Sequence, residues 1–291
     1  MNTEYIALIP FLILMVAFAL LNSAGKKKFG AFLQALDKKE YNLKDVMPAG
    51  FALMDAVHYD YTSGLDRTLR RQLAELYPAE YVEFYLRVIW AQAATATMLG
   101  LLMSTLFFGA TQGTVTYLIL GLGLTAALSW ASFADVKKKV DKRHAQVAID
   151  LPDLTNQIII LSGAGLTLRA AILKIANEMP AETPLYQMLG KVAEKMDHGA
   201  SDEEALDLLT TQCNMPEMRR FVSVILQNMH RGGSDVLTAL REIGKELWSA
   251  RKAAARRVAE ETSTKLLFPM VLMLIAVIIL AIAPAVMGMG I

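Results

Sequence analysis

The sequence predicts an all-α, polytopic membrane protein with four transmembrane helices and a cytoplasmic six-helix bundle. All 29 Lys and Arg residues fall in two blocks, Lys26 to Arg87 and Lys137 to Lys265, and the segments outside these blocks are strongly apolar. Within the second block, apolar residues recur at helical spacing between Gly, Pro and hydroxyl residues that start and stop helices. These two patterns predict membrane spans and a soluble helical bundle.

Four uncharged segments each approach the roughly 20 apolar residues that cross about 30 Å of hydrocarbon. They are Tyr5 to Leu21, Val88 to Phe108, Thr114 to Phe133 and Leu266 to Met287. The first is expected to be a retained anchor and not a signal peptide, because its positive charges follow the apolar run. The expected parts are a transmembrane anchor (1–23), a cytoplasmic helical region (24–87), a transmembrane hairpin (88–134), a cytoplasmic helical bundle (135–264) and a C-terminal transmembrane helix (265–291).

Basic residues concentrate on the cytoplasmic side of a membrane. Both basic blocks lie inside if the N-terminus is outside, Gly109 to Gly113 forms an outer hairpin, and Ile291 is outside. We therefore expect a multi-pass protein of the cytoplasmic (inner) membrane, with the lipid bilayer as a partner. The 28 acidic residues balance the basic ones to a net charge of +1, which argues against nucleic-acid binding.

In the first cytoplasmic block, the helical spacing of apolar residues from Phe29 to Leu36 is expected to break at Pro48-Ala49-Gly50. A second helix is expected from about Asp66 to Tyr77, because its leucines share one face. A third helix should begin near Glu80 and run directly into the second span.

Six short helices are expected in the second block. Each has its own start and stop signals: 150–165, 167–180, 183–199, 201–213, 214–233, and 234 onwards without a breaker before residue 269. The first is expected to follow Pro152, and Thr183-Pro184 provides an N-cap and a first-turn proline. Ser201 to Glu204 forms a capping-box pattern, and Gly199 and Gly233 are expected to end helices in a left-handed conformation. Each apolar stripe covers a single face, so the helices should pack on one another.

No motif for catalysis or cofactor binding is present. The sequence lacks a phosphate-binding P-loop, an H-E-x-x-H zinc motif and a G-x-S-x-G nucleophile motif. The four histidines, at positions 58, 144, 198 and 230, are scattered and are expected at surface or helix-end positions, and the lone Cys213 is expected to be buried. The spans contain no ionisable Asp, Glu, Lys, Arg or His, which counts against pumps and proton-coupled transporters. We expect no enzyme activity, no cofactor and no metal.

Four segments of the chain resemble the motifs of the type II secretion F domain. They are Ile158 to Ile172 (IIILSGAGLTLRAAI), Met196 to Leu206 (MDHGASDEEAL), Arg231 to Leu240 (RGGSDVLTAL) and Arg256 to Pro269 (RRVAEETSTKLLFP). The residues that carry the motifs are Gly165, Leu168, Ala170, Gly199, Ser201, Ala205, Leu206, Gly232, Gly233, Leu240 and Pro269. The family domain is a six-helix bundle, the same number of helices as the periodicity predicts. With one such domain before a last membrane helix, the chain is similar to the tight-adherence (Tad, Flp-type) pilus platform proteins of the TadB/TadC kind.

The resemblance implies a non-enzymatic inner-membrane platform that couples a cytoplasmic secretion ATPase to pilin assembly or export. The machine would be a type IV-like (Tad/Flp) pilus or a type II-like secretion system. The implied partners are the secretion ATPase, a sister platform protein and pilin subunits, in a homo- or hetero-oligomer. Candidate partner contacts are the charges Arg169, Glu203, Arg219, Arg220, Glu260 and Glu261. For any one of them a solvated face is the alternative, and for the last two a salt-bridged helix at the membrane surface. The competing hypothesis is a membrane subunit of a transporter or signalling complex.

Overall fold

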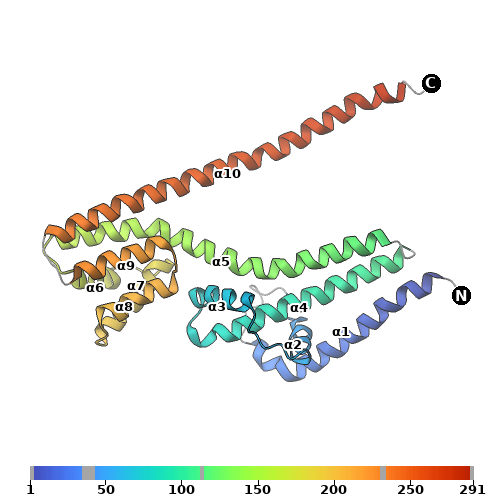
Figure 1. The fold of residues 1–291 in the computed structure, drawn as a ribbon, viewed down its shortest axis with the longest axis horizontal. Helices are drawn as coiled ribbons and strands as arrows, with labels where there is room; N and C mark the ends of the chain where they lie inside the picture. The colour runs from blue at the N-terminus through green and yellow to red at the C-terminus, as the bar shows by residue number, and fades with distance from the viewer. Residues whose placement is uncertain (1–2, 35–42, 112–114, 230–233, 289–291) are drawn as a thin grey trace. The chain divides into compact units, whose positions relative to one another are not determined.

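The computed structural model describes residues 3–34, 43–111, 115–229 and 234–288, and every regular element in these ranges is an α-helix (Figure 1). The helices belong to two compact units. Unit 1 comprises Met1–His144 and Thr211–Asn214, and unit 2 comprises Ala145–Thr210 and Met215–Ile291. The long helix α5 (Val115–Gly163) contributes to both units, and the expected domain boundary at residues 134 and 135 falls inside it. The predicted all-α fold class is confirmed for the described residues.

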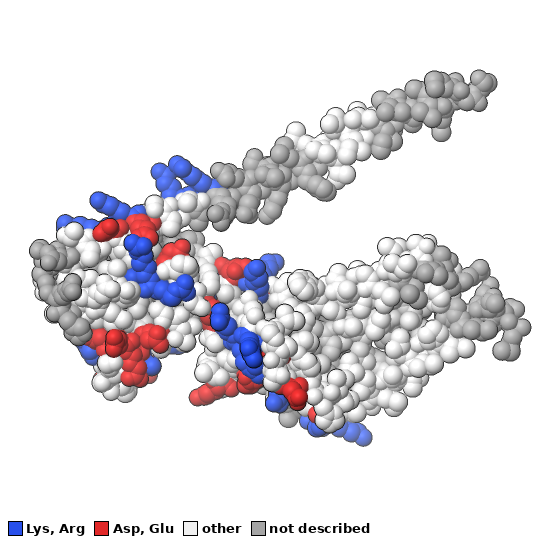
Figure 2. Space-filling model, in the orientation of Figure 1, with Lys and Arg blue, Asp and Glu red and all other residues white. Residues whose placement is uncertain are grey.

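Three helices of the described part are long and apolar enough to cross a membrane. Their candidate spans are Ile9–Gly30 in α1 (Thr3–Gln34), Ala79–Gly109 in α4 (Ala79–Ala110) and Ile119–Gly163 in α5. In unit 1, charged side chains gather at one end of these helices and uncharged surface covers the rest (Figure 2). The fourth expected span, Leu266 to Met287, lies within α10 (Ser234–Gly288), but most of its side chains fall outside the described residues.

A short helix that the sequence analysis missed, α2 (Met47–Ala56), packs against both α1 and α4. The prediction that Pro48-Ala49-Gly50 breaks the helical pattern is wrong, because these buried residues form the beginning of α2. A proline in the first turn loses no hydrogen bond, since the first amides of a helix have no partner within it. Gly50 lets the helices approach closely, because a Cβ there would overlap the carbonyl oxygen of Ala91 in α4. Two small-residue contacts thus fix α2, the second being between Gly25 of α1 and Pro48.

Helices α3 (Gly64–Leu76) and α4 confirm the second and third helices expected in the first cytoplasmic block. Leu69 and Leu73 of α3 are buried in a cluster with Leu86 and Ile89 of α4. The α4–α5 pair packs through small and hydroxyl residues. A Cβ on Gly100 would lie 2.7 Å from the Thr125 hydroxyl. Such close helix packing is typical of membrane proteins, where lipid supplies no hydrophobic force between helices.

Among the residues that the structure describes, unit 2 contains six helical segments. They are the end of α5, α6 (Leu168–Glu178), α7 (Pro184–Asp197), α8 (Asp202–Gln212), α9 (Pro216–Met229) and the start of α10. The starts of α6, α7, α8 and α9 confirm the sequence prediction, whereas the residues directly before Ser234 of α10 lie outside the described part of the chain. The prediction that the first begins after Pro152 is wrong, since α5 passes through this proline without ending. Val147 and Leu151 before it and Leu154 and Ile158 after it are all buried, so one continuous apolar stripe outweighs the missing backbone hydrogen bond.

Left-handed glycines end two of these helices, as the sequence predicts for Gly199. Gly165 has φ +98° and Gly199 has φ +87°. After each glycine, the next amide bonds back five residues, from Leu166 to Leu161 and from Ala200 to Lys195. This bond and the 3.1 Å bond from each glycine amide to the residue three before it form a Schellman motif. Gly233 lies outside the described residues.

The predicted N-caps form in part. The Thr167 hydroxyl accepts the Ala170 amide at 3.2 Å, and the Ser201 hydroxyl accepts the Glu204 amide at 3.1 Å. Thr183 takes the N-cap conformation without a side-chain hydrogen bond to the helix. The pattern of residues along the chain therefore predicts where these helices begin more accurately than it predicts which N-cap side chains form hydrogen bonds.

Candidate functional site

The described residues of the four sequence motifs have structural roles within the helical bundle of unit 2. Leu168, Ala205, Leu206 and Leu240 are buried. Gly165, Gly199 and Ser201 terminate or cap helices, and Ala170 donates its amide to the Thr167 cap. Pro269 is exposed in α10, whereas Gly232 and Gly233 lie outside the described residues. Within the described part, these motifs specify helix ends and packing and form no chemical site.

Arg169, a candidate partner contact, already forms an ion pair and a hydrogen bond within unit 2. Its guanidinium forms an ion pair with Asp202 at the start of α8. Its other terminal nitrogen donates to the Met196 carbonyl of α7 at 2.9 Å. Because one side chain joins three helices, its removal would disturb the bundle as well as any partner contact.

Glu203 lies in an acidic cluster at the start of α8, together with Asp202 and Glu204. Figure 2 shows acidic side chains gathered over this part of unit 2. Acidic residues in the first turn stabilise a helix through its dipole. The exposed Glu203 side chain is nevertheless available to a partner with positive charge.

Arg219 and Arg220 are exposed on α9. Arg220 Nε lies 3.0 Å from a carboxylate oxygen of Glu246, which links α9 to α10 on the surface. Exposed pairs of this kind contribute little stability and can exchange for a partner's carboxylate. The side chains of Glu260 and Glu261 lie outside the described residues.

A groove that the sequence analysis did not anticipate runs between the end of α5 and the start of α10, entirely within unit 2. Its volume is about 490 Å³. One wall is formed by Pro152, Asn156 and Ile159 of α5, and the other by Arg241, Gly244, Lys245 and Trp248 of α10. We call it the α5–α10 groove. The i, i+4, i+7 spacing of Arg241, Lys245 and Trp248 places them on one helical face, a signal that was present in the sequence.

The α5–α10 groove is basic and carries an exposed aromatic ring. Neither Arg241 nor Lys245 forms an ion pair with any residue that the structure describes. Trp248 is 48% exposed, and the guanidinium of Arg251 lies 4.9 Å from its ring centre. Arg251 is held in turn by Asp153 at 3.1 Å. Tryptophan and arginine are the residues most enriched at the energetic centres of protein interfaces, so the groove suits an acidic protein surface.

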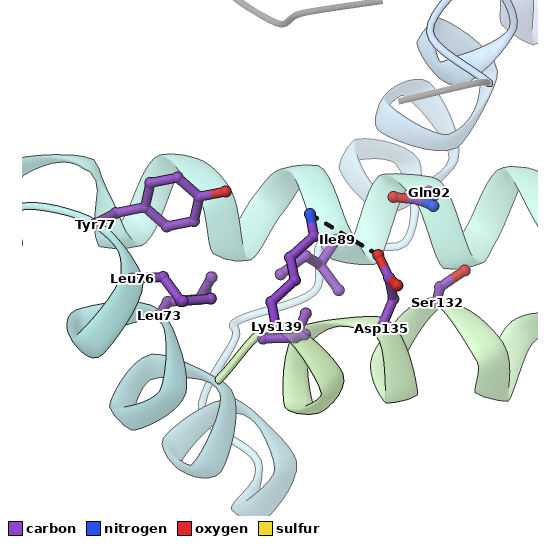
Figure 3. Close-up of a pocket in the computed structure, with 9 residues that line it drawn as sticks. Leu73, Leu76, Tyr77, Ile89, Gln92, Ser132, Asp135 and Lys139 are labelled. Atoms are coloured by element: carbon purple, nitrogen blue, oxygen red, sulfur yellow. Dashed lines mark ion pairs between the residues drawn. The ribbon is translucent and has the colours of Figure 1, made fainter. Parts of the chain in front are cut away.

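A smaller cavity in unit 1 is too small for a ligand. It is enclosed by α3, α4 and α5 and has a volume of about 20 Å³, enough for one water molecule (Figure 3). Its polar wall includes Gln92, Ser132 and the Asp135–Lys139 ion pair, whose charged atoms are 3.8 Å apart. We interpret it as a small gap in the helix packing that polar side chains border. Among the described residues, no three His, Cys, Asp or Glu side chains are placed to bind a metal ion.

Of the three histidines that the structure describes, one departs from the sequence prediction, and His230 lies outside the described residues. His144 is not at a helix end but within α5, where its Nε2 lies 2.5 Å from the buried carboxylate of Glu75 in α3. Glu75 also accepts the Asn214 amide at 3.1 Å. The prediction was wrong because the partner is 69 positions away in the sequence, beyond the reach of a spacing argument. Cys213 is buried, as expected.

Comparison with known proteins shows which family this bundle is similar to. No curated protein and no solved structure matches the chain. Residues 154–284 match the model of one family, described as type II secretion system (T2SS), protein F. The match covers a little under half of the chain, from the end of α5 through most of α10. Members of that family are non-catalytic membrane platform proteins of secretion and pilus systems. This chain is therefore similar, over residues 154–284, to the type II secretion system protein F family.

Proposed function

We propose that this protein is an inner-membrane platform of a Tad/Flp-type pilus or a type II-like secretion machine. The match of residues 154–284 to the protein F family and the three candidate spans of the described part support this role. In this proposal four spans anchor the chain, both termini are outside, and the basic blocks lie in the cytoplasm. Pilin subunits and a sister platform protein contact the spans, and a secretion ATPase contacts unit 2.

The observation that carries the proposal is the continuity of α10, one helix of 55 residues from Ser234 to Gly288. Its first turns are part of the bundle, where Val236, Leu240 and Ile243 are buried. Its later part contains the apolar segment expected to cross the membrane. At 1.5 Å per residue this helix is about 80 Å long. A displacement applied to its start would be transmitted towards the membrane without crossing a flexible joint.

The α5–α10 groove is our candidate for the ATPase contact. It includes the start of α10, so a partner bound there would act directly on this helix. The exposed Trp248 can supply a buried anchor, and Arg241 and Lys245 can pair with acidic residues of the partner. Arg219, Arg220 and Glu203 stay candidate contacts on the exposed surface of unit 2.

Binding of the full-length protein to the secretion ATPase of the same machine tests this assignment. In detergent solution, Trp248→Ala should weaken binding by about tenfold or more, as is typical of interface tryptophans. Arg241→Glu should weaken binding several-fold at low salt and less at high salt, because exposed charges are screened. Lys191→Glu on α7, which reverses an exposed charge away from the groove, is the matched control. Wild-type affinity in both groove variants would contradict the assignment.

Two further experiments test the wider proposal. A reporter that is active only outside the cytoplasm should be active when fused within Gly109 to Gly113 and silent when fused near Gly199. The reverse result would overturn the topology. Deleting the gene should abolish surface pili or secretion while the substrate subunits are still made. Normal assembly in the deletion strain, with no sister gene to compensate, would favour the transporter or signalling hypothesis.

A further inference from the structure

A second pocket lies in unit 1, where the end of α1, α2, the loop 57–63 and the start of α4 meet. Its volume is about 260 Å³, just below the roughly 300–1,000 Å³ of pockets for drug-sized ligands. Four aromatic rings line it, those of Phe29, Phe51, Tyr59 and Tyr61. We call it the aromatic pocket. It differs from the α5–α10 groove in lying wholly within unit 1 and in presenting charges of both signs.

The aromatic pocket lies at the polar ends of two candidate spans. Phe29 is next to the last residue of Ile9–Gly30, and Arg87 lies in the first turns of Ala79–Gly109. The cluster Lys26 to Lys28 directly precedes Phe29. Basic residues at the end of a span, together with tyrosine and tryptophan, mark the level of the lipid head groups. A ligand in this pocket would therefore lie among phospholipid head groups.

The charges of the aromatic pocket are divided between its walls. The Arg87 guanidinium lies 5.9 Å from the Tyr61 ring centre and forms no ion pair with a described residue, so its N–H groups can bind a phosphate. Asp55 and Asp60 supply negative charge. Asp55 already holds an ammonium group, that of Lys28 at 2.7 Å, and this hydrogen bond lowers the pKa of Asp55. Asp60 is exposed and pairs with no described cation.

The loop that forms one side of the aromatic pocket is held in an unusual conformation. His58 has φ +51° and Tyr61 has φ +52°, a left-handed region that residues other than glycine seldom adopt. The fully buried Asp66 fixes this loop, since its carboxylate accepts the Ser63 amide at 2.8 Å and the Tyr59 hydroxyl at 3.0 Å. Backbone strain of this kind is retained where the surrounding structure determines it, and it concentrates at binding sites. The pocket is thus preformed.

We propose that the aromatic pocket binds the phosphoethanolamine head group of a membrane phospholipid, with the phosphate at Arg87 and the ammonium at Asp60 and the aromatic rings. A primary ammonium donates hydrogen bonds to a carboxylate and is attracted to aromatic faces. A glycerol head group carries no cation, so its phosphate would lie near Asp60 without supplying a positive charge to pair with that carboxylate. A choline head group has no N–H to donate to Asp60.

Native mass spectrometry of the full-length, delipidated protein in detergent tests the proposal. The probes are phosphatidylethanolamine, phosphatidylglycerol and phosphatidylcholine with identical acyl chains. Phosphatidylethanolamine should bind about tenfold more tightly than phosphatidylglycerol, the scale of one hydrogen bond to a charged group. Arg87→Gln should weaken the binding of all three lipids. Asp60→Asn should remove the preference for phosphatidylethanolamine.

The controls are Arg67→Gln and Glu80→Gln, which remove exposed charges of unit 1 that do not line the pocket, and both should leave all three affinities unchanged. Circular dichroism of each variant should show wild-type helix content. Wild-type affinity for phosphatidylethanolamine in Arg87→Gln, or equal wild-type affinities for phosphatidylethanolamine and phosphatidylglycerol, would overturn the proposal. Soluble phosphoethanolamine distinguishes the source of the head group. If only a large excess of soluble phosphoethanolamine displaces the lipid, the result supports a lipid ligand. If soluble phosphoethanolamine binds more tightly than the lipid, the result refutes a lipid ligand.

Discussion

Replacing Asp66 by Ala should release the loop 57–63 from α3 and α4. The Asp66 carboxylate is fully buried. One oxygen accepts hydrogen bonds from the Ser63 amide at 2.8 Å and the Tyr59 hydroxyl at 3.0 Å, and the other accepts the Trp90 indole N–H at 2.6 Å. The Ser63 hydroxyl caps α3 by accepting the Asp66 amide, so a complete capping box joins the loop to the helix. Alanine would leave three donors without their acceptor.

The size of the destabilisation depends on the number of hydrogen bonds that are lost and on the backbone strain that is relieved. Each hydrogen bond to a charged acceptor contributes about 1.5–3 kcal/mol, so three would contribute about 5–9 kcal/mol if they were independent. They share one carboxylate and are therefore coupled. Release of the loop also relieves the left-handed residues His58 and Tyr61, which returns about 1–3 kcal/mol for each. The net local destabilisation should be about 3 kcal/mol.

Hydrogen–deuterium exchange of the purified protein in detergent measures this effect. A local destabilisation of about 3 kcal/mol corresponds to roughly 100-fold faster exchange in peptides covering residues 57–66. Asp66→Asn keeps the shape and one acceptor oxygen and should give an intermediate rate. Arg67→Ala, a change at the exposed neighbouring position, should exchange as the wild type does. Unchanged exchange of this segment in Asp66→Ala would refute the reasoning that Asp66 holds the loop.

Three further predictions concern pH, helix packing and helix ends. Burial raises the pKa of Asp66, but hydrogen bonds from Ser63, Trp90 and Tyr59 outweigh it and hold the pKa below its ordinary value. The stabilisation is therefore present above the unfolded-state pKa of about 3.9 and is lost as the pH falls through the lowered folded-state pKa. The protection of residues 57–66, which is their exchange rate compared with the intrinsic rate at the same pH, should therefore fall below about pH 4 in the wild type and not in Asp66→Asn. Gly50→Ala should lower the thermal stability of the protein by about 1–3 kcal/mol, because the added methyl group would overlap Ala91 and Thr95, whereas Gly30→Ala meets nothing within 4 Å and should not. A stable Gly50→Ala protein would contradict the packing of α2 on α4. Gly199→Val should destabilise unit 2 by about 1 kcal/mol or more through its left-handed backbone, and Lys191→Ala should not; equal melting temperatures would remove the support for this helix end.

Much of the helical framework could be predicted from the sequence because its determinants are local. The apolar stripes and the capping residues act within one or two turns, which is why α6 to α9 begin where Thr167, Pro184, Ser201 and Pro216 place them. The left-handed Gly199 is local in the same sense. Length and hydropathy of a segment are likewise properties of the segment alone, and three spans follow from them.

Proline was the least reliable of these local signals. Pro48 lies in the first turn of α2, although it was expected to break a helical pattern. Pro152 lies inside α5, although a new helix was expected to begin after it. The free energy of a proline in a helix is set by a lost hydrogen bond of fixed size and by packing that varies with the neighbours. The neighbours of Pro48 include Gly25 of α1, about twenty positions away. Local pattern therefore could not decide either case.

The sequence by itself determined most of the helical segments and which of them are apolar enough to span a membrane. Only the tertiary structure decided which charged side chains are paired within the protein and which can bind a partner. Arg169 is occupied by Asp202, whereas Arg241 and Lys245 face a groove whose other wall belongs to α5. The aromatic pocket likewise joins residues of α1, α2 and α4 around a loop that Asp66 holds. The physical reason is that helix formation depends on neighbours in the chain, whereas a binding site depends on which faces meet after the helices pack.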